Sequence, residues 1–199
     1  MGAVETVSIP DQREDPTRMV PHVKSKLDYD DLALAPHDGN QYELLDGELF
    51  ATPAPNPFHQ RASKRLQRQL ERYFEARGLG EVFDAPLDVI LTRHDVVEPD
   101  LIVVTDPQQI SRRGIEGPPA IVVEILSPST ADDDRTLKLK RYEATGVPHC
   151  WILDLEAQRL DCYRLTDQHY VLATSATSHQ PFHHPDWPDL EIDVLVLWT

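Results

Sequence analysis

The chain has 199 residues, of which 40% are hydrophobic and 27% are charged, as in a globular protein with one substantial core. Its formal net charge of -15 excludes a uniformly basic surface, the usual basis of electrostatic DNA binding. Two cysteines, Cys150 and Cys162, exclude a disulfide framework, and we expect two buried thiols. Since no apolar run approaches the roughly 18 residues that span a bilayer, we expect a cytoplasmic protein that does not enter a membrane.

The N-terminal part of the chain changes character near residue 25. Residues 1–25 mix Pro10, Pro16 and Pro21 with polar residues and show no sustained apolar period. We therefore predict a mobile N-terminal arm over residues 1–25 and a single domain over residues 26–199. A short helical turn is expected near residues 29–34. It is followed by a hairpin around Asp46-Gly47, a dipeptide typical of tight turns.

Residues 59–77 carry the clearest helical pattern. Apolar residues recur on one face at Ala62, Leu66, Leu70, Tyr73 and Phe74, and Gly78 stands where a helix C-terminus favours it. The other side carries a basic stripe of Arg61, Arg65, Arg68 and Arg72. Two interpretations stay open: contact with a phosphate backbone, or an ordinary solvated face balanced by neighbouring glutamates.

The middle of the chain predicts buried strands that alternate with a second helix. Strands are expected over residues 87–91, 101–104 and 121–126, and the last two are nearly continuous apolar runs, typical of strands covered on both faces. A helix over residues 132–144, capped by Ser129 or Thr130, precedes a strand over 150–153. A final hairpin is expected from residues 159–165 and 170–173. This order predicts an α/β fold.

Two carboxylates stand where a charge is costly. Asp100 precedes one apolar strand, and Glu124 lies inside the run Ile121 to Leu126. A buried carboxylate must be paired, protonated or bound to a cation. If the two strands are neighbours, Asp100 and Glu124 come side by side and offer the oxygen ligands that Mg²⁺ prefers. We therefore predict a metal site at this pair.

Lys138 is the expected cation beside the carboxylates. It lies four residues after Asp134 and four before Tyr142, on the helix face predicted to meet the sheet, whereas Lys140 points elsewhere. Its ammonium group could orient a water nucleophile or neutralise charge on a phosphate. A plain salt bridge to Asp134 or Glu124 is the alternative, and it does not exclude the first interpretation.

Several motifs together resemble a known family. They are Tyr42-Glu43-Leu44-Leu45-Asp46-Gly47-Glu48, Glu98-Pro99-Asp100, Val123-Glu124-Ile125-Leu126-Ser127-Pro128-Ser129-Thr130, Asp134-Arg135 with Lys138 and Tyr142, and Gly146-Val147-Pro148 through Trp151-Ile152-Leu153-Asp154. In this order they resemble the Uma2 family, also called DUF820, which is counted among the PD-(D/E)XK nuclease-like folds. The resemblance implies a restriction-endonuclease-like core with a central mixed sheet flanked by helices. It also implies Mg²⁺ or Mn²⁺ bound by residues matching Asp100 and Glu124.

The chain departs from the wider superfamily at one position. A lysine usually stands two residues after the second carboxylate, but this chain has Leu126 there. The resemblance implies that Lys138, on the following helix, takes over. Glu43 is the match for a further acidic residue of the site, with Glu48 behind it; alternatively, Glu43 is a solvated strand residue.

Other polar residues make weaker candidates. The histidines His59, His94, His149, His183 and His184 lack the spacing of a zinc site, and Ser127 and Ser129 lack the setting of a nucleophile and suit helix capping. Two functions therefore compete. The first is a Mg²⁺-dependent endonuclease acting on nucleic acid, with DNA as the expected substrate and a homodimer suggested by analogy of fold. The second is an interaction or regulatory module, which the acidic charge favours.

Overall fold

The computed structural model describes residues 26–126, 133–177 and 180–199, so the predicted arm and the predicted caps Ser129 and Thr130 lie outside the described residues. The helices are α1 Tyr29–Leu32, α2 Pro57–Phe74, α3 Asp133–Thr145 and α4 Leu195–Trp198, with one 3₁₀ turn, Pro107–Gln109. The strands are β1 Gln41–Leu45, β2 Glu48–Thr52, β3 Glu81–Asp84, β4 Val89–Thr92, β5 Asp95–Val97, β6 Leu101–Val104, β7 Ile115–Glu116, β8 Ile121–Leu126, β9 His149–Asp154, β10 Arg159–Thr166, β11 His169–Thr177, β12 Phe182–His183 and β13 Glu191–Ile192. Among these described helices, none is long and apolar enough to cross a membrane.

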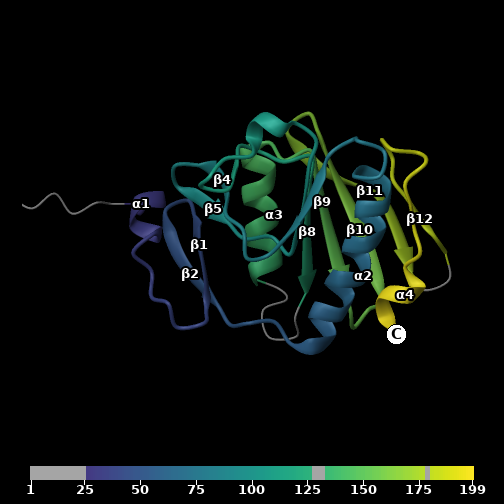
Figure 1. Ribbon diagram of the computed structural model, residues 1–199, viewed down its shortest axis with the longest axis horizontal. Coiled ribbons are helices and arrows are strands. Elements are labelled where there is room, and N and C mark those ends of the chain that lie inside the picture. Colours follow the sequence, from purple (N-terminus) through teal and green to yellow (C-terminus); the bar gives the residue numbers. More distant parts are fainter. Residues whose placement is uncertain (1–25, 127–132, 178–179) are drawn as a thin grey trace, which may run out of the picture.

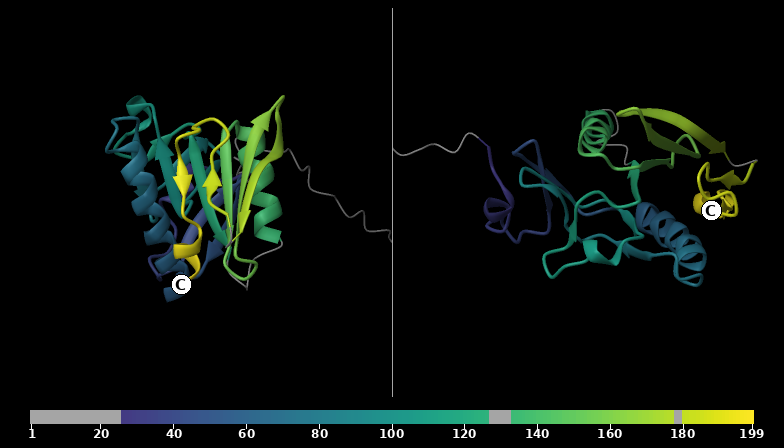
Figure 2. Two further views of the ribbon diagram at one scale, coloured as in Figure 1. Left: turned by 90° about the vertical axis from the view of Figure 1, so that its right-hand side faces the viewer. Right: turned by 90° about the horizontal axis from the view of Figure 1, so that it is seen from above.

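A six-stranded sheet forms the centre of the fold, in the order β11-β10-β9-β8-β6-β3. Strands β8 and β9 are parallel, and the other neighbours are antiparallel, so the sheet is mixed as predicted. Helix α3 makes the crossover between the parallel pair. Figures 1 and 2 show α2 and α3 on opposite faces of this sheet. The predicted α/β class, a central mixed sheet flanked by helices, is confirmed.

The nearly continuous apolar strands are buried on both faces. Val103 and Val123 pack in the cluster beneath α2, whereas Ile102 and Val122 pack in the cluster beneath α3. Successive residues of a strand point to opposite faces, so a strand between two layers needs apolar residues at every position. A charge in such a strand, as at Glu124, therefore needs its own compensation.

Helix α2 begins two residues earlier than predicted. The Asn56 side chain accepts hydrogen bonds from the backbone N–H groups of Phe58 and His59, and Pro57 takes the first helical turn, where its missing N–H costs nothing. The predicted apolar face is buried, and it also includes His59. Gly78 has the positive φ of 65° that favours glycine after a helix end.

A second sheet, in the order β2-β1-β5-β4-β7, carries the predicted hairpin. Asp46 and Gly47 both have positive φ, as the tight turn requires, and Leu45 lies opposite Glu48. The short strands β3, β5, β7, β12 and β13 were not predicted, because two to four residues are too few to show an alternating period. The predicted strand 87–91 begins two residues later, at Val89.

Candidate active site

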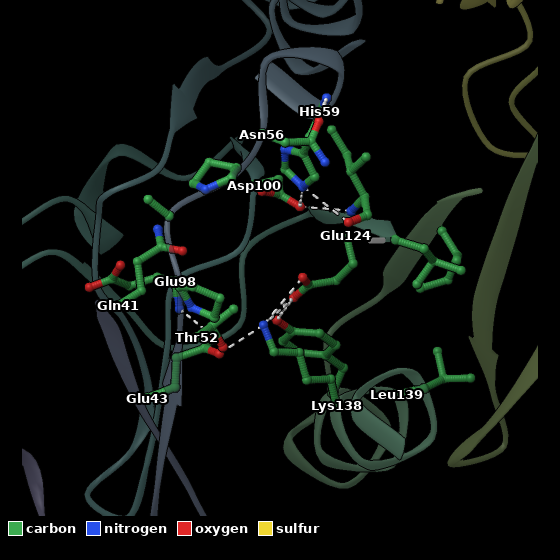
Figure 3. Close-up of a pocket in the computed structure, with 17 residues that line it drawn as sticks. Gln41, Glu43, Thr52, Asn56, His59, Glu98, Asp100, Glu124, Lys138 and Leu139 are labelled. Atoms are coloured by element: carbon green, nitrogen blue, oxygen red, sulfur yellow. Dashed lines mark hydrogen bonds and ion pairs between the residues drawn. The ribbon is translucent and has the colours of Figure 1, made fainter. Parts of the chain in front are cut away.

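One cavity of about 260 Å³ brings the predicted site residues together. It lies between the β1–β2 hairpin and the two helices α2 and α3 (Figure 3). Its charged and titratable lining residues are Glu43, His59, Glu98, Asp100, Glu124, Lys138 and Tyr142. All four residues predicted from the sequence as site residues, Glu43, Asp100, Glu124 and Lys138, therefore line one space.

The pairing of β6 with β8 explains why Asp100 and Glu124 meet. The strands are antiparallel neighbours with Leu101 opposite Val123, so the start of β6 lies beside the end of β8. The Oδ2 atom of Asp100 accepts a hydrogen bond of 2.7 Å from the backbone N–H of Ile125. The neighbouring-strand arrangement that the metal prediction required is thus present.

Lys138 reaches the cavity from α3. Its Nζ lies 3.3 Å from both carboxylate oxygens of Glu124 and 2.9 Å from Oε2 of Glu43. Burial lowers the pKa of Lys138, but the charges of Glu124 and Glu43 outweigh burial and raise it above its usual range. Lys138 is therefore a fixed cation, while Lys140 is exposed, as predicted.

Glu124 is held from a second side by the same helix. The hydroxyl of Tyr142 donates a short hydrogen bond to Oε1 of Glu124, and Tyr142 is fully buried. Burial raises the pKa of Glu124, with Glu43 and Asp100 adding to the effect against the opposing charge of Lys138. The single positive charge of Lys138 does not balance the negative charges of the carboxylates around it. The ionised form of Glu124 is therefore disfavoured in this cavity.

Glu43 is part of the cavity wall and is not a solvated strand residue. Its exposed fraction is 3%, its Oε2 pairs with Lys138, and its Oε1 accepts a 2.8 Å hydrogen bond from the backbone N–H of Glu98. Glu48, the second candidate for this acidic position, is exposed on the neighbouring strand and does not line this cavity. Glu43 thus bridges the hairpin and α3.

Sequence reasoning missed Glu98 as a site residue. Its Oε2 is buried without a hydrogen-bond partner, and burial, followed by the charges of Asp88 and Glu43, raises its pKa to about 7. The only signal was its place two residues before Asp100, which puts both side chains at the entrance to β6.

His59 was also set aside on sequence grounds, because it lacks zinc-site spacing. In the structure its Nε2 lies 3.1 Å from the carbonyl of Ile125 and 3.3 Å from Oδ2 of Asp100. Burial lowers the pKa of His59, but Asp100 outweighs burial and raises it. Helical spacing from Ala62 and Leu66 could have indicated that His59 faces the sheet.

The donor set fits a hard divalent cation. Four carboxylates face one lysine, Glu98 carries an unpartnered buried oxygen, and carboxylate oxygens are the ligands that Mg²⁺ and Mn²⁺ accept. Asp100 and Glu124 are the residues that would hold the ion, with Glu98 next to them. In the described residues these acids do not form a set of three ligand atoms all within 4.8 Å of one another. Lys138 pairs with Glu124, and the Ile125 N–H donates to Asp100.

A second titratable cluster lies beneath β12, away from this cavity. Ligand atoms of His149, Cys162 and His184 lie within 4.8 Å of one another, and all three residues are buried. The Nδ1 atom of His184 accepts hydrogen bonds from the backbone N–H groups of Asp186 and Trp187. Because a backbone N–H only donates, the ring proton of neutral His184 is on Nε2, which faces Cys162 Sγ at 3.9 Å as a donor and not as a metal ligand.

The basic stripe on α2 is interrupted. Arg61, Arg68 and Arg72 are exposed, but Arg65 is half-buried and donates to the carbonyls of Val196 and Thr199. Arg65 therefore fastens α4 to α2. The exposed cations on the described part of α2 are left for solvent or a ligand.

Comparisons with known proteins identify the family of the chain. The Uma2 family model, described as "Putative restriction endonuclease", matches residues 28–195. The uncharacterized protein slr1290 of Synechocystis sp. is 26% identical over 129 residues, 64% of this chain and 67% of that protein. The crystal structure of a "putative nuclease belonging to DUF820" from Anabaena variabilis superposes with a TM-score of 0.70 at 18% identity, covering 86% of this chain and 97% of that one. The fold is therefore restriction-endonuclease-like, and the chain belongs to the Uma2 family.

Proposed function

We propose that this protein is a Mg²⁺- or Mn²⁺-dependent endonuclease that hydrolyses phosphodiester bonds in DNA. The observation that carries the proposal is the convergence of Glu43, Glu98, Asp100 and Glu124 on one cavity with Lys138 among them. A surplus of carboxylates over cations suits a divalent ion, and a lysine beside them suits a phosphate. The description of the family and the name of the Anabaena relative support the same reaction class.

Asp100 and Glu124 are the residues that would bind the cation, which supplies charge stabilisation to a phosphoryl oxygen when bound. Hydrogen bonds to fixed partners orient both carboxylates: the Ile125 N–H holds Asp100, and the Tyr142 hydroxyl holds Glu124. Lys138 stays protonated and can donate to a non-bridging phosphate oxygen. Because Lys138 is already paired with both Glu43 and Glu124, it is positioned before substrate arrives.

Hydrolysis forms a P–O bond to water and breaks the P–O bond to the leaving oxygen, and the proton of the water needs an acceptor. Glu98 is the group best suited to accept it, because its Oε2 is unpartnered and its pKa lies near 7. We assign Glu98 this role within the proposed reaction.

A plasmid-nicking assay tests the proposal. Purified wild-type protein is incubated with supercoiled DNA and Mg²⁺, Mn²⁺ or EDTA, alongside Asp100→Asn, Glu124→Gln and the control Glu191→Gln, an exposed acid on β13. We expect metal-dependent nicking by the wild type and by the control, and a loss of about 100-fold or more in both site variants, because several kcal/mol of charge stabilisation disappear. Circular dichroism checks that the variants remain folded.

Absence of cleavage of both supercoiled and single-stranded DNA by the folded wild type with either metal would contradict the enzyme function. A non-catalytic interaction module on the same fold is the second candidate, and the net charge of -15 is the observation that favours it. It predicts a folded protein without metal-dependent cleavage whose site variants still bind the same partner.

We also propose that the substrate is DNA and that the protein is a homodimer, and each of these two statements has its own test. Matched DNA and RNA oligonucleotides in the same assay decide the first. Light scattering on the purified protein decides the second, because enzymes that cut both strands commonly act as symmetric dimers.

A further inference from the structure

A second cavity adjoins the candidate active site. It has a volume of about 260 Å³ and is lined by Asn56, Phe58, Arg61, Leu126, Leu155, Glu156, Leu197, Trp198 and Thr199. Asn56 and Leu126 also line the carboxylate cavity, so the two spaces meet at these residues. Figure 1 shows α4 beside the N-terminal half of α2. Residues of both helices, such as Phe58 and Leu197, line the second cavity.

The second cavity presents the aromatic ring of Phe58, which the core of the fold does not bury. The side chain of Phe58, in the first turn of α2, is 69% exposed, which is unusual for a large apolar residue with no partner to cover it. The guanidinium carbon of Arg61 lies 5.6 Å from the centre of the Phe58 ring. Trp198, partly buried against the core, also lines this cavity, and Arg65 donates to the Val196 carbonyl of the same helix at 2.8 Å. A flat ring beside a cation is the usual platform for a nucleobase.

The charges on α2 fit a phosphate backbone that passes both cavities. Arg61 lines the aromatic cavity, while Lys64 lines a larger groove of about 600 Å³ that also includes His59 and Asp100. Both cations are exposed, and neither makes an ion pair in the described part of the chain. Two cations of α2 therefore lie at cavities next to the carboxylates, on a protein whose net charge is strongly negative. Such local cations suit the phosphates on either side of a scissile bond.

We propose that the aromatic cavity binds one unstacked nucleobase, from a nucleotide next to the scissile phosphate, so that the preferred substrate is a single strand or an unpaired end. A base in a duplex is stacked on both sides and cannot lie against Phe58, whereas a base in a single strand can. Glu156 at the rim offers an acceptor for an exocyclic amine of that base. This inference rests on the proposed nuclease function and names its substrate class.

The test is an abasic scan along a single-stranded oligonucleotide. One abasic nucleotide is stepped through a fluorescently labelled strand, and binding is measured by anisotropy with Ca²⁺ in place of Mg²⁺ to limit cleavage. We expect one position at which loss of the base weakens wild-type binding about tenfold, the effect of one stacked base. Phe58→Ala should bind the intact strand about tenfold more weakly and lose this dependence, while Phe58→Tyr keeps it.

Controls separate this inference from the proposed function. Leu172→Ala removes another exposed apolar side chain, 54% exposed on β11, and should leave binding unchanged. A wild type that cleaves DNA, but whose Phe58→Ala variant binds and cleaves like it, overturns the base cavity and leaves the nuclease intact. If one abasic position weakens wild-type binding but the wild type cleaves no DNA, the base cavity is supported and the nuclease function is overturned. Equal affinity for duplex and single strand, or a change of oligomeric state in Phe58→Ala without a change in binding, also overturns the proposal.

Discussion

Two clusters of buried titratable side chains in the described residues differ in how their charge is compensated. Beneath β12, His149, Cys162 and His184 are packed among aromatic rings. The ring centroids of His149 and His184 are 4.5 Å apart. Burial lowers the pKa of His184 to about 3 and raises the pKa of Cys162 to about 12, so both groups are neutral. That cluster behaves as core.

The carboxylate cavity remains charged instead. Glu98 titrates near pH 7, Lys138 is protonated, and Glu43 and Glu124 share that single ammonium group. Buried groups that a fold requires only for packing are neutral, or paired as Asp95 is with Arg141, whereas a buried carboxylate oxygen without a partner beside a cavity costs stability and favours a bound cation. The difference supports the acids, and not the histidines, as the proposed functional cluster.

The largest expected effect comes from removing the shared cation. Lys138→Met leaves the buried carboxylates of Glu43 and Glu124 without their shared cation and should lower the free energy of unfolding by about 3–5 kcal/mol in EDTA. If the cavity binds a divalent ion, Mg²⁺ or Mn²⁺ should restore much of this loss, because the ion replaces the ammonium charge. Urea unfolding with and without metal measures both effects. A loss that the metal leaves unchanged would argue against a cation site at Glu124.

A smaller effect is expected in the neutral cluster. His184→Phe keeps an aromatic ring but leaves the N–H groups of Asp186 and Trp187 without their acceptor, at a cost of about 1–3 kcal/mol. Metal affinity and nicking should stay at wild-type values. A variant that loses a bound transition metal on purification would show that this cluster is a metal site after all.

The smallest effect is a pH-dependent one at Glu98. Since its pKa is raised from 4.5 to about 7, the folded state holds a proton that the unfolded state releases, and stability falls as pH rises through this window. Glu98→Gln should therefore stabilise the protein at pH 8 by about 1 kcal/mol, discounted because the side chain is only half-buried, and should have little effect at pH 4. Unfolding curves at the two pH values check the sign; greater stabilisation at pH 4 would contradict it.

The central strands and helices were predictable because their periods are long and regular. The run from Ile121 to Leu126 and the helical face of Ala62 and Leu66 record burial directly in residue type. The site was predictable for the same reason, since Glu124 interrupts an apolar strand and Lys138 lies on an inward helix face.

The contributions of Glu98 and His59 were not predictable from local pattern. His59 reaches Asp100 only because α2 crosses the end of β8, and the orphaned oxygen of Glu98 depends on the packing of the hairpin sheet against the main sheet. The cavity beside Phe58 similarly requires α4, a four-residue helix too short to show a period. Long-range packing, and not sequence pattern, determines these contacts.

Direct Mn²⁺ binding tests the central claim, that the carboxylate cavity is a divalent-cation site. Calorimetry on the wild type, Asp100→Asn, Glu124→Gln and the control Glu191→Gln reports the affinity independently of any nuclease activity. We predict that the wild type and the control bind Mn²⁺ with an affinity that rises between pH 6 and 8, as Glu98 loses its proton near pH 7, and that both site variants bind about tenfold or more weakly. No binding to the folded wild type, or equal affinity in all four proteins, would contradict the account.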